Sequence, residues 1–300
     1  MPYIPLQKEQ PPKPHHHIGR WLAVLIVLTG VVGGIRLVSE HHLIIPKLSA
    51  HAVLVKHISE PTTAQITTMN QQINNVIAQN PNMDIGVSVI NLDNNQTYNY
   101  GETDPFIAAS VGKLITASLY LQDVQNGTYT MSQELSYDTA QNELKNMIVN
   151  SDNTAWTDFN GLLGHDALQN YGNQIGLTNY DPDVNTMTAS DISSLLSKLY
   201  KGQLLNPTNT QLLLSYMKQA DTDYGQYIVA AVPSGVTVYH KVGWLSDRVH
   251  DAAIITDGTH SYVLVIFTKA EDGSNYDETA GEQVFHQITQ ATDQTFLGRS

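Results

Sequence analysis

Residues 106–113 read Phe-Ile-Ala-Ala-Ser-Val-Gly-Lys, and they place Ser110 three residues before Lys113 where an apolar helix is predicted to begin. Residues three apart lie on one face of a helix, so the lysine amine can sit beside the serine hydroxyl and assist loss of its proton. The unpaired N–H groups and partial positive charge of a helix N-terminus favour an oxyanion next to the attacking serine. This stretch therefore predicts a nucleophilic serine activated by a lysine.

Two further motifs distinguish this serine from an accidental match. Ser215 and Lys218 have the same spacing without chemistry around them, and they serve as an internal control. Only the first pair is followed along the chain by Ser151-Asp152-Asn153 and then by Lys241-Val242-Gly243. In this order the three motifs resemble those of class A β-lactamases and penicillin-binding proteins, a resemblance that covers roughly residues 61–300.

The resemblance implies roles for the first two motifs. Ser110 is the nucleophile, and Lys113 is its proton acceptor or electrostatic activator. Ser151 relays a proton to the leaving nitrogen, while Asn153 holds the substrate amide and steadies Lys113. Asp152 ties down the turn that carries them, which lies between two predicted helices.

The third motif falls in an alternating, β-branched run that is predicted to be an edge strand lining the active-site groove. Lys241 supplies positive charge for a substrate carboxylate, and Gly243 lets a substrate backbone approach. The backbone N–H of Trp244 is the expected partner of the Ser110 N–H in an oxyanion hole.

The sequence departs from the family pattern at this strand. Val242 stands where a threonine or serine is usual, so a hydroxyl that would bind the substrate carboxylate is absent. Arg248 is a candidate replacement for that contact, and a surface charge is the equal alternative. We interpret His240 and His250 as structural and Asp251 as a buried capping residue.

A second departure concerns hydrolysis of the acyl-enzyme, for which class A β-lactamases use a glutamate that activates water. No glutamate occurs between Glu143 and Glu271. Asp181 and Asp183 lie in a segment with the outline of the required loop, shortened so that Asn185 falls at its end. An aspartate is one methylene shorter, and a misplacement of about 1 Å can cost on the order of 10²-fold in rate. We therefore expect slow release, with Asp181 or Asp183 as the candidate base.

Composition limits the remaining possibilities. The chain has no cysteine, which excludes disulfides, thiolate metal sites and a cysteine nucleophile. Five basic and two acidic residues give residues 1–47 a charge of +3. The other residues carry −16, so the net charge of the chain is −13. An acidic body argues against nucleic acid as a partner. No metal-ligand spacing is visible among the twelve histidines, and no cofactor is expected.

The order of predicted elements indicates an α+β fold. A helix and two strands precede Ser110, an all-helical stretch follows at about 128–220, and three strands and a helix close the chain. The resulting expectation is an antiparallel sheet flanked by helices with an inserted helical subdomain. The predicted helices are 61–79, 110–125, 139–149, 153–163, 166–175, 189–200, 208–217 and 278–296, and the predicted strands are 84–91, 97–100, 236–244, 251–256 and 261–269.

The N-terminal 60 residues have a different character. Residues 1–20 read as a flexible tail, residues 21–38 as an apolar segment near the lower length limit for a transmembrane helix, and residues 39–60 as a linker. A cleaved signal peptide ending near Ala50-His51-Ala52 and a buried core helix are the alternatives. The positive-inside bias favours an uncleaved anchor with a cytoplasmic tail and an extracellular body at residues 61–300.

These observations predict a membrane-anchored, extracellular serine hydrolase that forms an acyl-enzyme with β-lactams or related peptidoglycan amides. A penicillin-binding or D,D-carboxypeptidase-like protein is the alternative among enzymes. A cell-wall-binding module that keeps the groove without catalysis is the alternative outside enzymes.

Overall fold

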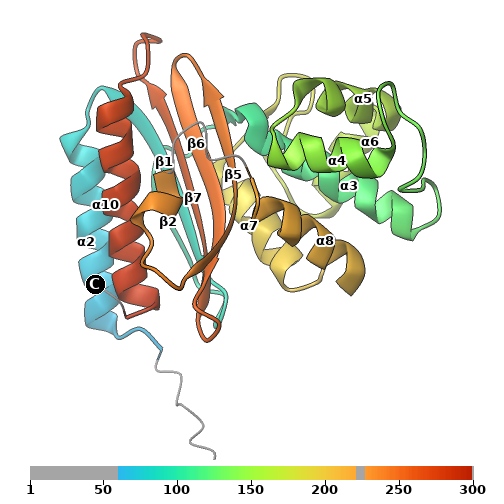
Figure 1. The fold of residues 1–300 in the computed structure, drawn as a ribbon. Helices are drawn as coiled ribbons and strands as arrows, with labels where there is room; N and C mark the ends of the chain where they lie inside the picture. The colour runs from blue at the N-terminus through green and yellow to red at the C-terminus, as the bar shows by residue number, and fades with distance from the viewer. Residues whose placement is uncertain (1–59, 221–226, 299–300) are drawn as a thin grey trace, which may run out of the picture. The chain divides into compact units, whose positions relative to one another are not determined.

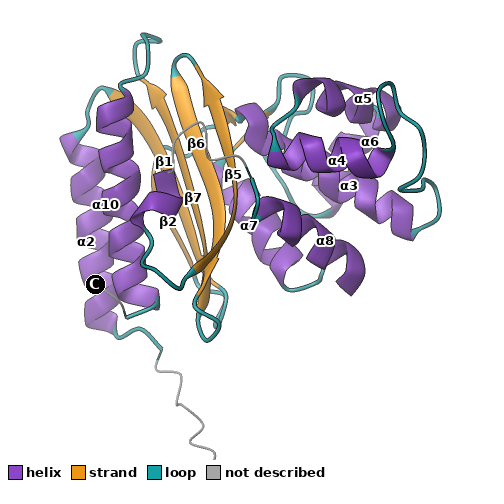
Figure 2. Cartoon of the chain, in the orientation of Figure 1, coloured by secondary structure: helices purple, strands orange, loops and turns teal. Residues whose placement is uncertain are grey.

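A five-stranded antiparallel sheet forms the centre of the fold, with helices on both of its faces (Figures 1 and 2). The computed structural model describes residues 60–220 and 227–298. The strands lie in the order β2 (Thr97–Gly101), β1 (Met83–Asn91), β7 (Ser261–Ala270), β6 (Arg248–Thr256) and β5 (Thr237–Leu245). Segments from both ends of the chain therefore meet in one sheet, and β5 is an edge strand.

The central strand β7 shows why this sheet is covered on both faces. Its side chains alternate between two apolar cores: Val263 and Val265 belong to one cluster, whereas Leu264 and Ile266 belong to the other. Successive side chains of a strand point to opposite faces, so a nearly continuous apolar run requires packing on both sides. Residues 262–267 are all fully buried.

Two long helices cover one face of the sheet, namely α2 (Thr63–Gln79) and α10 (Glu278–Phe296), together with the short α9 (Tyr227–Ala231) (Figure 1). A capping box between Thr62 and Gln65 fixes the start of α2. The buried residues of α2 are Met69, Ile73 and Val76, whose spacing of four and three residues forms one apolar stripe.

The helical part lies on the other face (Figure 1). Its helices are α3 (Lys113–Gln125), α4 (Ala140–Val149), α5 (Asn153–Leu163), α6 (His165–Gln174), α7 (Ala189–Tyr200) and α8 (Pro207–Met217). Every residue of α3 from Lys113 to Leu121 is buried, so α3 is the central helix of this part. The helix α7 packs against β1, β6 and β7, and the hydroxyls of Ser88 and Ser193 meet at 2.7 Å across this contact.

The predicted α+β arrangement is confirmed, and most predicted helices and strands lie within a few residues of their observed bounds. The structure adds a two-residue pairing of β3 (Phe106–Ile107) with β4 (Thr186–Met187), and β4 lies inside the stretch that was predicted to be all-helical. It also adds α9. Strand β6 begins at Arg248 and not at Asp251, because the polar residues before Asp251 hid the strand pattern.

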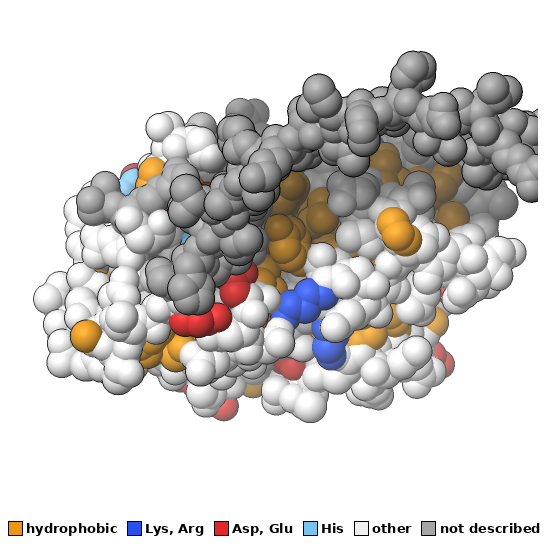
Figure 3. All heavy atoms as spheres, turned by 90° about the horizontal axis from the view of Figure 1, so that it is seen from below, with side chains coloured by type: hydrophobic (Ala, Val, Ile, Leu, Met, Phe, Trp, Pro, Cys, Tyr) orange, Lys and Arg blue, Asp and Glu red, His pale blue; other side chains and the backbone are white. Residues whose placement is uncertain are grey.

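The exposed surface carries few charged groups on the face seen in Figure 3, where charged side chains occupy small separate spots among uncharged ones. This agrees with a chain in which only 14% of residues are charged. Among the described residues visible in this view (Figure 3), the acidic and the basic side chains appear as separate small groups.

The predicted tail, transmembrane anchor and most of the linker, residues 1–59, lie outside the described residues. Among the helices that the structure describes, none has both the length and the apolar character that crossing a membrane requires.

Candidate active site

A turn between β3 and α3 carries Ser110, and it is held from several sides. It forms a short 3₁₀ helix (Ala109–Gly112) that leads directly into α3. The Ala108 N–H donates to the Asn185 carbonyl at 2.8 Å. Ala109 has φ +49°, a left-handed conformation that is unusual for a residue other than glycine. The surrounding contacts thus hold a strained turn, and strain of this kind concentrates at functional sites.

Lys113 is the first residue of α3, and its ammonium lies at the centre of the site. Its Nζ is 2.9 Å from Ser110 Oγ, 2.6 Å from the Ser151 carbonyl oxygen, 3.3 Å from Ser151 Oγ and 2.7 Å from Asn153 Oδ1. The side chain is fully buried. The first two motifs are therefore brought together on one amine, as the sequence predicts.

The turn between α4 and α5 supplies Ser151 and Asn153. Ser151 has φ +56°, the second strained residue at the site. Asp152 is the N-cap of α5, and its carboxylate accepts from the N–H groups of Thr154 at 2.7 Å and Ala155 at 3.0 Å. The expectation that Asp152 ties down this turn agrees with its contacts.

Lys241 reaches the same place from the edge strand β5. It is 2% exposed, and its Nζ lies 3.0 Å from Ser151 Oγ and 3.2 Å from the Val242 carbonyl oxygen. The Ser151 hydroxyl therefore contacts both lysines. A hydroxyl shared by two amines is well placed to pass a proton between a nucleophile and a leaving group.

Burial and charge together change the acidity of Lys113. Burial is the largest cause, the nearby positive charge of Lys241 is the second, and together they lower the pKa of Lys113 to about 7, against a weaker opposing effect of Asp152. A substantial fraction of Lys113 is consequently a neutral amine near pH 7. A neutral amine beside Ser110 can accept its proton, which an ammonium cannot do.

The structure gives a different reason for a glycine at position 243 from the one that the sequence suggests. A Cβ atom at this position would stand 2.7 Å from the Ala108 carbonyl oxygen and 3.1 Å from the Ser110 nitrogen. Glycine is therefore required because β5 passes directly against the serine turn. Its role in admitting a substrate backbone stays a prediction.

A cavity of about 320 Å³ opens at this cluster. Three apolar residues of β5 are part of its lining, namely Val242, Trp244 and Leu245. Trp244 is 44% exposed and Leu245 is 38% exposed, so large apolar side chains stand open at the site. The polar residues that line the cavity are Ser110, Ser151, Asn153 and Lys241.

Arg248 does not join this cluster. Its guanidinium pairs with Asp247 through Nε at 2.8 Å and Nη2 at 2.5 Å, and it lines a separate cavity with Lys269. The suggested replacement of the missing hydroxyl by Arg248 therefore has no support in this geometry, because a neighbouring carboxylate already occupies the bidentate guanidinium.

The two aspartates considered for water activation also lie apart from the cavity. Asp181 Oδ1 accepts from the Asp183 N–H at 2.8 Å, and Asp183 Oδ1 lies 2.6 Å from His165 Nδ1 on the exposed surface. Neither carboxylate lines the cavity or contacts Lys113 among the described contacts. Contacts within their own loop and with His165 hold these carboxylates, and a role for either as the base for water stays a prediction.

Two residues at the site were not assigned a role from the sequence. Asn185 has φ +53°, and its Nδ2 donates to the Ala109 carbonyl at 2.9 Å, so it clamps the serine turn from the β4 side. Trp156 places its ring 5.4 Å from Lys113 Nζ. The tryptophan carries no sequence signal beyond its position three residues after Asn153 on a helix.

His240, which precedes Lys241 on β5, and His250, on the neighbouring strand β6, have structural contacts. The buried His240 Nδ1 lies 3.1 Å from Asp251 Oδ1. His250 Nε2 lies 2.9 Å from the Ile107 carbonyl oxygen, and its Nδ1 accepts from the Thr268 N–H at 3.2 Å. His250 therefore links β6 to the strand that precedes the serine turn. In the part of the chain that the structure describes, no group of His, Asp or Glu side chains is arranged to hold a metal ion.

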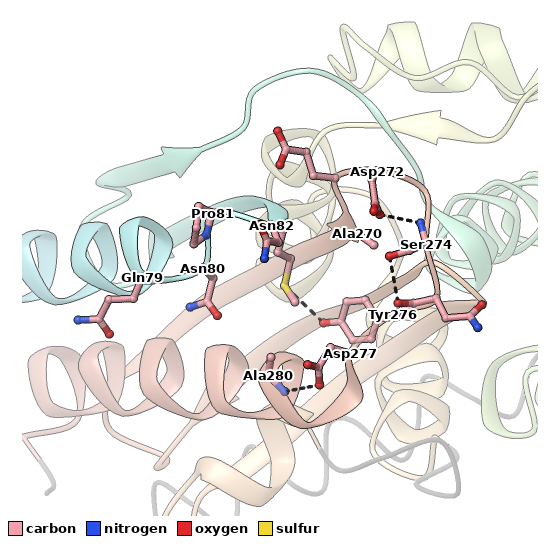
Figure 4. A pocket seen from close by; sticks show the side chains of 13 residues that line it. Gln79, Asn80, Pro81, Asn82, Ala270, Asp272, Ser274, Tyr276, Asp277 and Ala280 are labelled. Carbon is pink, nitrogen blue, oxygen red and sulfur yellow. Dashed lines mark hydrogen bonds between the residues drawn. The ribbon is translucent and has the colours of Figure 1, made fainter.

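A larger cavity of about 470 Å³ lies elsewhere, between the end of α2 and the loop that joins β7 to α10 (Figure 4). Amide, carboxylate and hydroxyl side chains line it, and Asp277 caps α10 there by accepting from the Ala280 N–H at 3.0 Å. No lysine is among the described residues that line it. The chemistry of this chain therefore points to the smaller cavity at Ser110.

Comparison with known proteins identifies a matching family and similar solved structures. The model of the beta-lactamase enzyme family matches residues 68–296. The solved structure of PBP-A is similar at 25% identity and a TM-score of 0.69, covering 76% of this chain and 96% of PBP-A, and a mutant of PBP-A is described as an acyl-enzyme complex with penicillin G. A beta-lactamase from Sphaerobacter thermophilus is similar at 20% identity and a TM-score of 0.67, covering 76% of this chain and 96% of that one. None of the curated proteins matches the sequence.

Proposed function

Because the chain belongs to the beta-lactamase enzyme family, we propose that it is a serine hydrolase that forms an acyl-enzyme on Ser110 with β-lactams or related peptidoglycan amides. One observation carries this proposal. Lys113 Nζ lies 2.9 Å from Ser110 Oγ while burial and Lys241 lower the pKa of Lys113 to about 7. A nucleophile and a base with a pKa near the working pH are thus in contact.

The acylation step follows from the contacts at the site. Ser110 Oγ attacks the carbonyl carbon of the substrate, and its proton passes to the neutral amine of Lys113. The carbon–nitrogen bond then breaks, and the Ser151 hydroxyl gives a proton to the leaving nitrogen while it regains one from Lys113. Ser151 suits this relay because its Oγ contacts both Lys113 and Lys241. The N-terminus of α3 favours the oxyanion of the intermediate.

Release of the acyl group is the slow half of the proposed cycle. Hydrolysis needs a positioned base for water, and general-base assistance contributes typically 10²–10⁴-fold. Asp181 and Asp183, the candidates for this base, are engaged with each other and with His165 away from the cavity. An adduct on Ser110 should therefore persist.

The cavity wall favours substrates with an apolar group beside the scissile carbonyl. Trp244 and Leu245 present exposed apolar surface there, and covering it removes that surface from water. Val242 offers no hydroxyl to a substrate carboxylate, and Arg248 is held by Asp247. Binding of a carboxylate at this strand thus depends on Lys241.

A penicillin-binding or D,D-carboxypeptidase-like activity is the second candidate function. The similarity to PBP-A, of which a mutant is described in an acyl-enzyme complex with penicillin G, supports it. So does the cavity lining, because no aspartate or glutamate is among the described residues that form it. A wall-binding module without catalysis would keep the cavity but has no need for a lysine held against a serine.

We also propose that residues 21–38 anchor the protein in the membrane with the catalytic body outside the cell. The apolar run and the preceding basic residues support this topology. Protease added to intact cells should digest the body. A body protected from protease, or a soluble secreted form that begins near His51, would contradict the anchor.

Labelling with a fluorescent penicillin tests the proposed function. The protein should become covalently labelled, whereas Ser110→Ala should not. A folded protein that binds peptidoglycan but is never labelled would favour the non-catalytic module.

A further inference from the structure

Helices α3 and α5 meet through polar side chains next to the proposed catalytic pair. Lys113 and Thr116 lie one turn apart on α3, while Asn153, Trp156 and Asn160 follow at intervals of three and four residues on α5. Asn153 Oδ1 accepts from Lys113 Nζ at 2.7 Å. One turn further along, the Trp156 Nε1 donates to Thr116 Oγ1 at 3.0 Å, and Thr116 donates to Asn160 Oδ1 at 2.9 Å.

These hydrogen bonds fix the indole ring of Trp156. Thr116 is 1% exposed, so its hydroxyl is committed to the two partners on α5. An indole has one donor, and that donor is used here. The ring therefore has a fixed orientation relative to Lys113, and its centroid lies 5.4 Å from the ammonium nitrogen.

Lys113 does not need the ring as a hydrogen-bond acceptor, because it already has other acceptors. An ammonium has three donors, and four oxygen atoms already lie within 3.3 Å of Nζ. The ring instead contributes to the burial of the Lys113 amine. Lys113 is fully buried, and its amine lies over the ring of the partly exposed Trp156, so the indole is one of the groups that enclose the amine.

We propose that Trp156 is a positioning residue: its indole ring shields the amine of Lys113 from water and holds it against Ser110. The significance of this role for catalysis rests on the proposed function, in which Lys113 takes the proton of Ser110. The shielding itself does not depend on catalysis.

The expected direction of the effect follows from the balance of forces on the amine. A ring face attracts a cation and so favours the charged form, whereas exclusion of water favours the neutral form. Despite the ring, burial is the largest influence on Lys113, and the pKa is lowered. The charged groups that act on this amine are Lys241 from β5 and Asp152 from the turn before α5, and neither depends on the ring. Removal of the ring should therefore raise the pKa of Lys113.

The test is a titration of Lys113 followed by the chemical shift of its Cε in ¹³C-lysine-labelled protein, with Lys113→Met used only to assign the signal. Trp156→Ala admits water, and the pKa of Lys113 should rise by about one unit or more. Trp156→Phe keeps a ring but loses the bond to Thr116, and its pKa should stay near that of the unchanged protein. Thr116→Val keeps the ring with a free indole N–H and should also cause only a small shift.

A folded Trp156→Ala variant with an unchanged Lys113 pKa would overturn the proposal, because a structural role alone lowers stability without moving this titration. If Trp156→Ala does not fold, Trp156→Leu replaces it, with the same expected direction. The acid limb of penicillin acylation should shift by the same amount as the titration. A protein that shows no acylation but a raised Lys113 pKa in Trp156→Ala would contradict the proposed function and leave the shielding supported.

Discussion

Gly243 lies so close to Ala108 that a Cβ atom on the glycine would stand 2.7 Å from the alanine carbonyl oxygen. This contact joins the edge strand β5 to the serine turn and sets the distance between the second lysine and the nucleophile. Backbone carbonyls cannot give way as a flexible side chain does, so any side chain at 243 must separate the two segments.

Gly243→Ala should therefore reduce the acylation rate on the order of 10²-fold, because a displacement of about 1 Å at a reacting centre has that effect. The rate of covalent labelling measures it. Gly161→Ala on α5 is the control, since nothing lies within 4 Å of a Cβ there and φ is not in the left-handed region. It should leave labelling unchanged. Equal labelling of both variants would mean that this contact does not position the serine.

The acylation rate should depend on the protonation of Lys113. Because the pKa of Lys113 is lowered to about 7, the amine is neutral above this pH and protonated below it. The rate should level off above about pH 7 and fall about tenfold for each pH unit below it. The rate of adduct formation between pH 5 and 9 measures this profile. A rate that is unchanged down to pH 5 would exclude Lys113 as the base.

Val242→Thr should strengthen the recognition of a penicillin carboxylate. Threonine has nearly the shape of valine and adds the missing hydroxyl, and a hydrogen bond to a charged group is worth about 1.5–3 kcal/mol, or roughly tenfold or more in affinity. The concentration dependence of labelling measures the gain. Val242 is 7% exposed, so the unfolding free energy should fall by about 1–3 kcal/mol. A neutral ester substrate serves as the control and should show no gain; a similar gain with that ester would contradict the carboxylate contact.

His250 should make the free energy of unfolding depend on pH in the acidic range. Burial lowers the pKa of His250 to about 4, from 6.5 in the unfolded chain, so the unfolded chain binds more protons between these two values. The free energy of unfolding should thus fall by about 3 kcal/mol as the pH falls from about 6.5 to about 4. Urea unfolding at several pH values measures this slope, and His250→Gln should flatten it. An equal slope in both proteins would assign the acid sensitivity to other groups.

The elements of this fold were largely predictable because their signals are local. The predicted bounds of helix α5 are the same as the observed ones, because Asp152 is a clear N-cap and Gly164 a clear C-cap. The pairing of β3 with β4 was not predictable. Two residues show no periodicity, and their partners lie about 80 positions away along the chain.

The site was predictable to the extent that motif spacing determines it. Ser110, Lys113 and Ser151 meet as expected, because a motif records residue types that one site must bring together. The contacts of Arg248 with Asp247 and of Asp183 with His165 were not predictable, since nothing in the spacing of the motifs shows them. The cover that Trp156 provides depends on how α5 packs against α3, which only the tertiary structure specifies.

Mass spectrometry of the intact protein after mixing with a penicillin tests the central claim most directly, that Ser110 is acylated and released slowly. The spectrum should show one added penicillin per chain that persists for many minutes and is located on Ser110 by peptide mapping. Ser110→Ala should show no adduct, and Ser215→Ala, on the exposed surface of α8, should behave like the unchanged protein. An adduct that persists in Ser110→Ala would contradict the nucleophile. Rapid turnover without a detectable adduct would contradict slow release, and if Asp181→Asn or Asp183→Asn then stopped turnover, an aspartate would be the base for water.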